Sequence, residues 1–306
     1  MSIFKNNRLI VLVSFVIIML IAGITFLFNN KEVIKFEHIH GLGFAANEEI
    51  MMPAHDGIRI YKNNGWELSK NDGHDYMGFS IVENGFYSSG HPAQNSNLKN
   101  PFGIIKSDKD GSKLKPLALY GEVDFHGMAA GYYTNSIYVI NSAPNSIMKT
   151  PGLYYSVDEA KNWEKSNAEN LSGQASTIAS HPSNNKIVAI GTDEGAYLSN
   201  DFGNRFVNVL KDKPVSALSF VFNEKLLIGS AGSKAEISIL DLKTNDMNQI
   251  EMPKLDKKEF ITFIANNPKQ NDEIVFATSD NNIYLTKNLG EQWETIAKHG
   301  EGIKMK

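Results

Sequence analysis

A short frame that recurs along the chain constrains its fold more than any other feature of the sequence. The frame reads S/T-x-D/N-x-G/A-x-x-W/F and follows an aromatic–apolar pair, as in YYSVDEAKNWEK at residues 154–165. Short hydroxyl, carboxylate and amide side chains bond nearby backbone N–H groups and close turns, and glycine supplies the positive φ that such turns need. The final aromatic side chain packs back onto the sheet. Each copy therefore predicts a hairpin turn between two strands.

The frame is complete at three places in the second half of the chain. Its residues there are Ser156, Asp158, Trp163, Ser199, Asp201, Gly203, Phe206, Thr286, Asn288, Gly290 and Trp293. Two weaker relatives lie upstream at residues 58–68 and 104–115, where the frame is shortened or its acid is displaced. We interpret these positions as structural turns and not as a catalytic site.

Between the turns, the chain divides into units of similar pattern. Each unit begins with an apolar run, at residues 38–44, 74–82, 124–132, 175–182, 215–222 and 260–267. Two further apolar runs follow, broken by Gly, Asn, Asp and Pro at short intervals, which is typical of strands joined by tight turns. Units of roughly 35–50 residues have the period of propeller blades. We therefore predict an all-β, six-bladed β-propeller over residues 36–298, followed by a tail at 299–306.

The N-terminal segment has a different pattern. Residues 9–28 carry no charge, and Lys5 and Arg8 precede them. About 20 apolar residues in a helix span the roughly 30 Å hydrocarbon layer of a membrane. No small-x-small cleavage site follows, so residues 1–30 are predicted to hold an uncleaved transmembrane helix, or signal-anchor, with a short linker at 31–35. Positive residues before the helix predict a cytoplasmic N-terminus, a single pass through the cell membrane and an extracellular propeller.

Charge and cysteine content exclude several classes of function. The net charge of −4 gives no electrostatic reason to expect a nucleic acid as partner. The chain has no cysteine, which excludes disulfides, thiolate nucleophiles and cysteine metal ligands.

The histidines are concentrated in similar phrases near the starts of the first three units. His38 and His40 begin the first unit, and His74 begins the second. In a blade the first strand lines the channel and the second runs antiparallel to it, so the start of one and the end of the other share a face. Alternate strand residues point the same way. We expect one ligand site on this face, formed by His38, His40, His55, His74, Tyr76, His91 and His126.

Imidazoles accompanied by carboxylates are ligands for divalent transition metals. The candidate metal ligands are His38, His40, His74 and His126. Met77 and Met128 lie beside the histidines, and thioethers favour copper(I), so copper is an alternative ion. The competing interpretation is that these histidines only bond the backbone at the channel mouth.

The recurrent frame resembles the Asp-box, or BNR repeat, of sialidases, sortilin-type receptors and related β-propellers. The phrases HIHGLGF, HDGIRIY, HDYMGFS, YSSGHP and DFHGMAAG make residues 36–298 similar to a family of bacterial membrane-anchored Asp-box propellers, often labelled glycosyl hydrolase-like. The resemblance implies a propeller with Asp-box turns on the face opposite to the histidines. The hydrolase label rests on similarity of fold, which does not establish a reaction.

Two further hypotheses follow from this resemblance. A glycoside hydrolase would need a pair of carboxylates, and the candidates on the histidine face are Asp56, Asp75 and Asp124. Sialidases bind the substrate carboxylate with three arginines, and the only arginines here are Arg8, Arg59 and Arg205, which argues against that activity. A protein-assembly scaffold would use blade edges and loops. The partner is thus a small molecule, a glycan or a protein.

Overall fold

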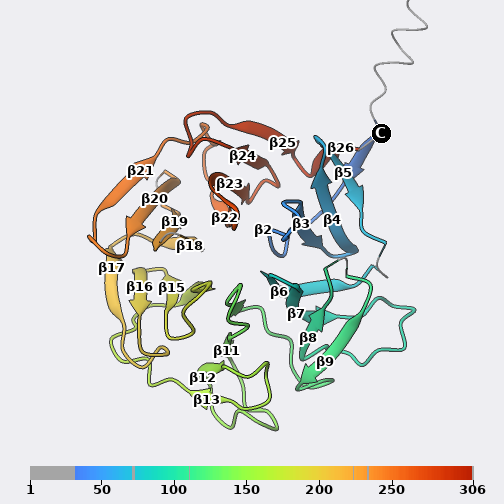
Figure 1. The fold of residues 1–306 in the computed structure, drawn as a ribbon, viewed down its shortest axis with the longest axis vertical. Helices are drawn as coiled ribbons and strands as arrows, with labels where there is room; N and C mark the ends of the chain where they lie inside the picture. Colours follow the sequence, from blue (N-terminus) through green and yellow to red (C-terminus); the bar gives the residue numbers. More distant parts are fainter. Residues whose placement is uncertain (1–31, 71–72, 110, 223, 233, 305–306) are drawn as a thin grey trace, which may run out of the picture.

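Six antiparallel sheets surround a central axis in the computed structural model, which describes residues 32–70, 73–109, 111–222, 224–232 and 234–304 (Figure 1). The prediction of an all-β, six-bladed β-propeller is confirmed. The expected transmembrane helix at residues 1–30 lies outside the described residues. Within the described ranges there is no helix whose length and apolar character would let it cross a membrane.

Each blade is a meander of four strands, and Figure 1 shows the first strand of each nearest the axis. The innermost strands are β2 (Gly43–Phe44), β6 (Asp75–Val82), β10 (Met128–Ala130), β14 (Ala175–Ser180), β18 (Val215–Val221) and β22 (Ile261–Asn267). The second strands are β3 (Ile50–Ala54), β7 (Gly85–His91), β11 (Ile137–Asn141), β15 (Val188–Thr192), β19 (Lys225–Ser230) and β23 (Gln270–Thr278). The third strands are β4 (Gly57–Lys62), β8 (Ile104–Ser107), β12 (Gly152–Ser156), β16 (Gly195–Ser199), β20 (Glu236–Asp241) and β24 (Ile283–Thr286). The outermost strands are β5 (Gly65–Leu68), β9 (Leu114–Ala118), β13 (Glu164–Lys165), β17 (Val207–Lys211), β21 (Met247–Ile250) and β25 (Glu294–Lys298).

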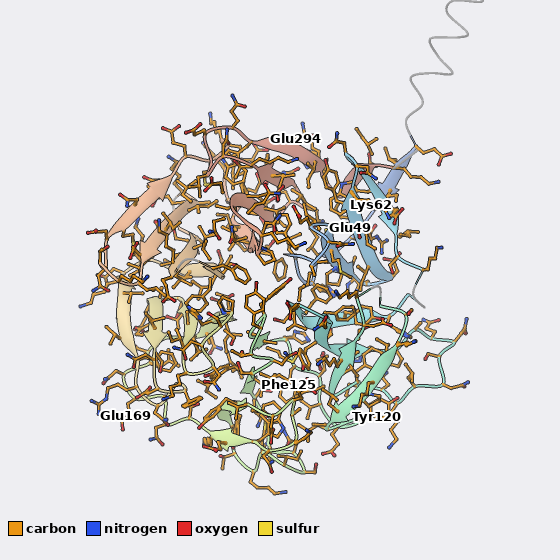
Figure 2. All side chains as sticks on the ribbon, in the orientation of Figure 1. Glu49, Lys62, Tyr120, Phe125, Glu169 and Glu294 are labelled. Carbon is orange, nitrogen blue, oxygen red and sulfur yellow. The ribbon has the colours of Figure 1, made fainter. Side chains whose placement is uncertain are left out.

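The core lies between neighbouring blades. Every residue of β3 and of β15 is buried, because adjacent sheets cover both faces of a second strand. Tyr138 of the third blade and Ile190 of the fourth belong to one apolar cluster. Charged residues lie at the strand ends instead, as for Glu49 before β3 and Lys62 at the end of β4, whose charged ends lie 3.8 Å apart over the first blade (Figure 2). Continuous apolar runs in the second strands follow from this two-sided burial.

Three turns between third and fourth strands share one hydrogen-bond scheme. In the third blade, Ser156 Oγ donates to Asp158 Oδ1 (2.9 Å) and accepts from the Ala160 N–H (3.0 Å). The Asn162 N–H donates a further hydrogen bond to Asp158 Oδ1 at 2.9 Å. Hydrogen bonds from Asn162 lower the pKa of Asp158 to about 2. The scheme recurs in the fourth and sixth blades.

The two ends of the described chain close the ring, which corrects the expected linker at 31–35 and tail at 299–306. A strand β1 (Val33–Lys35) pairs with a last strand β26 (Glu301–Ile303), which also pairs with β25. The sixth sheet therefore has six strands. Both strands escaped the sequence criteria because each has only three residues and is mostly exposed. Their pairing partners come from opposite ends of the chain.

A tryptophan stabilises the seam between the first and last blades. Trp66 in β5 is fully buried and donates its indole N–H to the Ile296 carbonyl of β25 at 2.7 Å. Gly302 in β26 lies against the indole, since a Cβ there would come within 2.2 Å of Trp66 Cδ1. Phe36 and Tyr61 pack on the same ring, with centroid distances of 5.6 and 5.2 Å. The seam thus combines apolar packing with a directed hydrogen bond from the indole.

Candidate functional site

The starts of inner strands and the ends of second strands meet on one face of the disc. Ile39 forms a bridge with Ala54, and Asp75 pairs with His91 across β6 and β7. These pairings bring residues far apart in sequence to the same rim. The structure divides the expected set of histidines into two clusters and one buried histidine.

The first cluster lies where the first and second blades meet, and we call its four residues, His38, His40, His55 and Asp75, the His40 cluster. Asp75 accepts from both His40 and His55: Oδ1 lies 2.8 Å from His40 Nδ1, and Oδ2 lies 3.1 Å from His55 Nδ1. The His40 and His55 rings stand perpendicular with centroids 4.4 Å apart. The His38 ring is 5.0 Å from that of His55. One carboxylate from blade two therefore holds two imidazoles from blade one.

Burial controls the charge state of His40. The His40 side chain is 11% exposed and that of Asp75 is 20% exposed, whereas His55 is half-exposed. Desolvation lowers the pKa of His40 below its usual value, and the Asp75 charge opposes this shift only in part. His40 is consequently neutral at neutral pH, which is the form of imidazole that binds metals.

The backbone of His38 contributes to this arrangement. Its φ of 51° lies in the left-handed region, which histidine adopts more readily than most residues. The turn precedes β2, and it places the exposed His38 ring beside His55.

The second cluster lies where the second and third blades meet, and we call its three residues, His91, Asp124 and His126, the Asp124 cluster. Asp124 Oδ2 is 2.7 Å from His126 Nε2 and 3.3 Å from His91 Nε2. Phe125, labelled in Figure 2, lies between Asp124 and His126 in the sequence and is 2% exposed. Its buried ring anchors the segment, while the His126 side chain is exposed.

His74 and Tyr76 do not join either cluster. Both are buried inside the second blade, and His74 Nδ1 accepts a hydrogen bond from the Ala93 N–H at 2.9 Å. The His74 ring packs on Phe102, with centroids 5.3 Å apart. The alternation of β6 turns Asp75 toward the rim and its two neighbours toward the core. In the second blade, the residue that joins the His40 cluster is therefore Asp75 and not His74.

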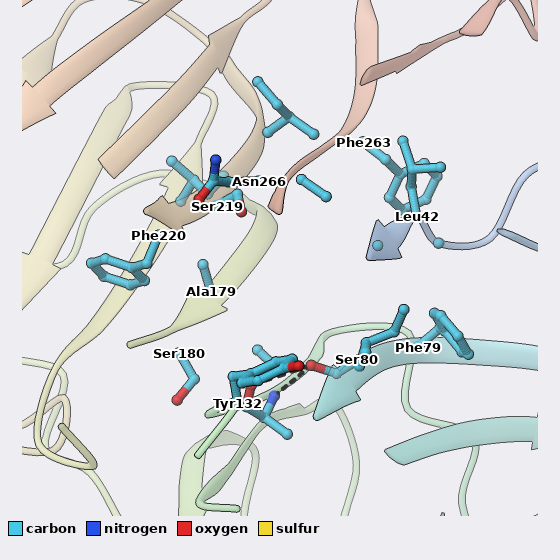
Figure 3. A pocket seen from close by; sticks show the side chains of 18 of the residues that line it. Leu42, Phe79, Ser80, Tyr132, Ala179, Ser180, Ser219, Phe220, Phe263 and Asn266 are labelled. Atoms are coloured by element: carbon cyan, nitrogen blue, oxygen red, sulfur yellow. Dashed lines mark hydrogen bonds between the residues drawn. The ribbon is translucent and has the colours of Figure 1, made fainter. Parts of the chain in front are cut away.

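The central channel is uncharged along the part that the described residues line. Its cavity of about 180 Å³ is bordered by inner-strand residues of all six blades. Figure 3 shows Leu42, Phe79, Ser80, Tyr132 and Asn266 among them, with the Ala130 N–H donating to Ser80 Oγ at 2.8 Å. No cluster histidine is among these lining residues. The clusters therefore lie at the rim of the channel, and this corrects the expectation of a single pocket in its mouth.

The candidate catalytic carboxylates are all engaged. Asp56 contacts the buried Arg59 through both oxygens, at 2.6 and 2.9 Å, and these hydrogen bonds lower the pKa of Asp56. Asp75 is hydrogen-bonded to two histidines, and Asp124 is hydrogen-bonded to His126 and lies 3.3 Å from His91 Nε2. Arg59 is thus a structural partner of Asp56.

The His40 cluster has the composition of a metal site. One ligand atom from each of His40, His55 and Asp75 lies within 4.8 Å of the others. Nitrogen and oxygen ligands at bonds of about 2.0–2.1 Å around a tetrahedral ion are about 3.3 Å apart, close to the separations seen here. A cation would replace ring protons at the imidazole nitrogens that now face the carboxylate.

The sequence analysis missed two features, one beside His91 and one in the sixth blade. Asn100 lies 2.7 Å from His91 Nδ1 through its Oδ1, although nothing in its sequence context marked it. A second acidic group, Asp256, Glu259 and Asp280, gathers in the sixth blade. There the buried Glu259 accepts hydrogen bonds from the Asn282 side chain and the Asp256 N–H, so it orders a loop.

Comparison with solved structures identifies related folds. The GH74 enzyme of Niastella koreensis aligns with a TM-score of 0.57 at 13% identity, over 87% of this chain and 46% of that one. A GH74 xyloglucanase from Xanthomonas campestris gives a TM-score of 0.53 at 13% identity, with the same coverage of 87% and 46%. YCF48 bound to a D1 peptide gives 0.50 at 14% identity, over 86% of this chain and 83% of that one.

This chain therefore spans about half the length of the GH74 enzymes that it resembles. No protein-family model matches the sequence, and no curated protein matches it. At such low identity the likeness concerns the fold alone. The chain shares the β-propeller fold with these proteins.

Proposed function

We propose that this protein is a membrane-anchored extracellular β-propeller that binds a divalent transition-metal ion at the His40 cluster. The observation that carries the proposal is the position of Asp75, whose two oxygens face His40 and His55 from across a blade boundary. The uncharged segment at residues 9–28 supports the anchor and the extracellular location.

The ligand set favours a zinc-type ion. Two imidazoles and one carboxylate form a set common at zinc sites that keep a position open for water or a ligand. His38 lies next to His55 and is the nearest further imidazole. Met128 is a buried member of the apolar core, so its thioether serves packing, which weighs against copper(I).

A protein-binding role is the second candidate. The YCF48 structure is bound to a D1 peptide and matches this chain over most of both lengths. Glycoside hydrolysis has less support, although GH74 enzymes share the fold, because each candidate carboxylate is held by an arginine or by histidines.

The metal proposal is tested by titrating zinc into the full chain in detergent micelles after chelator treatment, with calorimetric detection. We expect Asp75→Asn and His55→Ala to lose the zinc ion of this cluster, because each removes one ligand. The matched control is His299→Asn, which removes an exposed imidazole from a residue at φ 48°, where asparagine is well tolerated. Unchanged zinc binding in folded Asp75→Asn protein contradicts the proposal.

A peptide or protein that binds the propeller equally well with and without zinc, while zinc itself is not retained, favours the second candidate instead.

A further inference from the structure

We infer that one edge of the propeller, at the seam between its first and last blades, rests on the lipid surface of the membrane that holds the N-terminal anchor. This seam edge is the exposed side of β1 and β26 together with the end of β5, and its apolar residues are Val33, Leu68 and Ile303. The inference rests on the membrane anchor of the proposed function, and it is independent of metal binding at the His40 cluster.

Strands β1 and β26 extend the sixth blade beyond the others. Their sheet has six strands where every other blade has four, and Figure 1 shows β26 and β5 at the outer edge of the disc. One side of this two-stranded extension covers the first blade, since Ile34 is buried and Gly302 lies against the Trp66 indole. The residues that alternate with Ile34 and Gly302 are exposed, so the other side of the extension faces outward.

The outward side carries an apolar pair. Val33 and Ile303 are directly opposed in the pairing of β1 with β26, so their side chains project together, and they are 47% and 44% exposed. Leu68, which is 56% exposed, lies two residues after Trp66, whose backbone forms a bridge with Lys304. Of the ten large apolar side chains that are exposed among the described residues, three thus belong to these short strands. Exposed apolar residues that gather in this way mark contact surfaces for proteins or membranes.

The charges of this edge do not oppose contact with anionic lipid headgroups. Lys35 Nζ lies 3.0 Å from Glu301 Oε1, and Lys304 pairs with Glu32. Both carboxylates are therefore neutralised by lysines whose side chains are half-exposed or more. Such lysines suit a membrane interface, because the aliphatic stem lies along apolar surface while the ammonium group reaches lipid phosphates.

The distance from the predicted anchor selects the membrane as the occupant of this surface. Val33 follows the uncharged segment 9–28 by five residues, and an extended chain spans at most about 3.6 Å per residue. Val33 therefore lies within about 18 Å of the end of that segment. The headgroup layer on each side of the hydrocarbon is about 5–8 Å thick. A surface tethered so closely meets the bilayer at a high effective concentration, so a small apolar contact is sufficient.

Contact at the seam edge sets the orientation of the propeller. The first blade, which carries His40 and His55, forms one side of the seam. Arg59 connects the two regions, since it donates to the Lys35 carbonyl at 3.2 Å and to Asp56 at 2.9 Å. Asp56 directly follows His55 in the sequence. The inference thus predicts that the His40 cluster is held on the membrane side of the disc.

Single fluorescent labels test this contact, because the chain has no cysteine of its own. Ile303→Cys and Leu68→Cys, each in the full chain, carry an environment-sensitive fluorophore in vesicles of phosphatidylcholine and phosphatidylglycerol. We expect blue-shifted emission from both positions, and loss of that emission when the vesicles contain lipids with a nitroxide on the headgroup. The matched control is Val207→Cys, an exposed apolar position on β17 of the fourth blade, whose emission should not change.

A label in the predicted anchor separates this inference from the proposed function. Ile18→Cys lies near the middle of the uncharged segment and is expected in the hydrocarbon core. If nitroxides deep in the acyl chains do not quench this label, the anchor fails, and the membrane location in the proposed function fails with it. If they do quench it, while the labels at Ile303 and Leu68 behave like the label at Val207, the anchor stands and the seam-edge contact is refuted.

The double variant Val33→Thr with Ile303→Thr tests the apolar contact itself. Threonine keeps the β-branched shape that suits a strand, and its hydroxyl weakens contact with lipid. We expect the label at Leu68 to lose its quenching by headgroup nitroxides, while the label at Ile18 keeps its quenching by acyl-chain nitroxides. Blue-shifted emission that nitroxide lipids do not quench, and that disappears when the chain is diluted with more lipid, indicates contact with a second copy and refutes lipid as the occupant.

Discussion

The seam at Trp66 offers the most direct test of how the ring is closed. Replacing this residue with alanine removes a fully buried indole that contacts both the first and the last blade. It also removes the only side-chain hydrogen bond that the Ile296 carbonyl receives among the described residues. Both losses fall on the joint between strands from opposite ends of the chain.

The expected cost can be worked from these contacts. Truncation of a buried tryptophan to alanine costs about 3–5 kcal/mol, because apolar contact is lost and a cavity remains. A buried carbonyl left unpaired adds about 1–3 kcal/mol. For a domain of this size, each kcal/mol lowers Tm by about 2–4 °C. We therefore expect Trp66→Ala to lower Tm by at least roughly 8 °C.

The assay is thermal and urea unfolding followed by circular dichroism, with two matched substitutions. Trp66→Phe keeps most of the ring and loses the N–H, so it isolates the hydrogen bond. Trp163→Phe removes an indole N–H that donates only within its own turn, to the Ala160 carbonyl at 3.2 Å. If Trp66→Phe and Trp163→Phe cost the same, the seam bond has no special role in closure, and a Trp66→Ala cost below about 1 kcal/mol refutes the reasoning.

Three further predictions concern two of the turns and His40. Ser199→Ala leaves the Gly203 N–H without its acceptor and is expected to cost about 1–2 kcal/mol in urea unfolding; a change within error counts against the turn scheme. Asp158, with a pKa of about 2, stabilises its turn above its unfolded pKa of about 4, and this contribution is lost as pH falls toward 2. Asp158→Asn should therefore flatten the acid limb of the stability profile, and an unaltered limb is the contrary result. His40 has a lowered pKa, so the unfolded chain binds its proton first and stability falls as pH drops below about 6.5. His40→Asn should reduce this slope below about pH 6.5, and an unchanged slope assigns it to other groups.

Local signals in the sequence predicted the blades. The frame around Ser156 and Asp158 specifies its own turn, since the hydrogen bonds that the Ser156 hydroxyl and the Asp158 carboxylate make are formed within seven residues, Ser156 to Asn162. Continuous apolar runs marked the second strands because neighbouring blades bury them on both faces. Strands β1 and β26 gave no comparable signal, since their stability depends on a partner from the other end of the chain.

His74 and Asp75 show where the sequence pattern of a strand no longer predicts which side chains are exposed. Matching phrases placed His74 with the other histidines, but the alternation of β6 sends it into the core and exposes Asp75 instead. A shift of one residue reverses the side on which a strand residue lies, and the start of a strand is the least defined part of its pattern.

The sequence by itself determined that this chain forms six similar sheets and that its histidines gather near one face, because turn chemistry and apolar runs act over a few residues. Only the tertiary structure decided which of those histidines meet. His40 and Asp75 are 35 residues apart and belong to different blades. Their contact depends on the packing angle between two blades, and on a ring that closes only when β1, β26 and Trp66 come together.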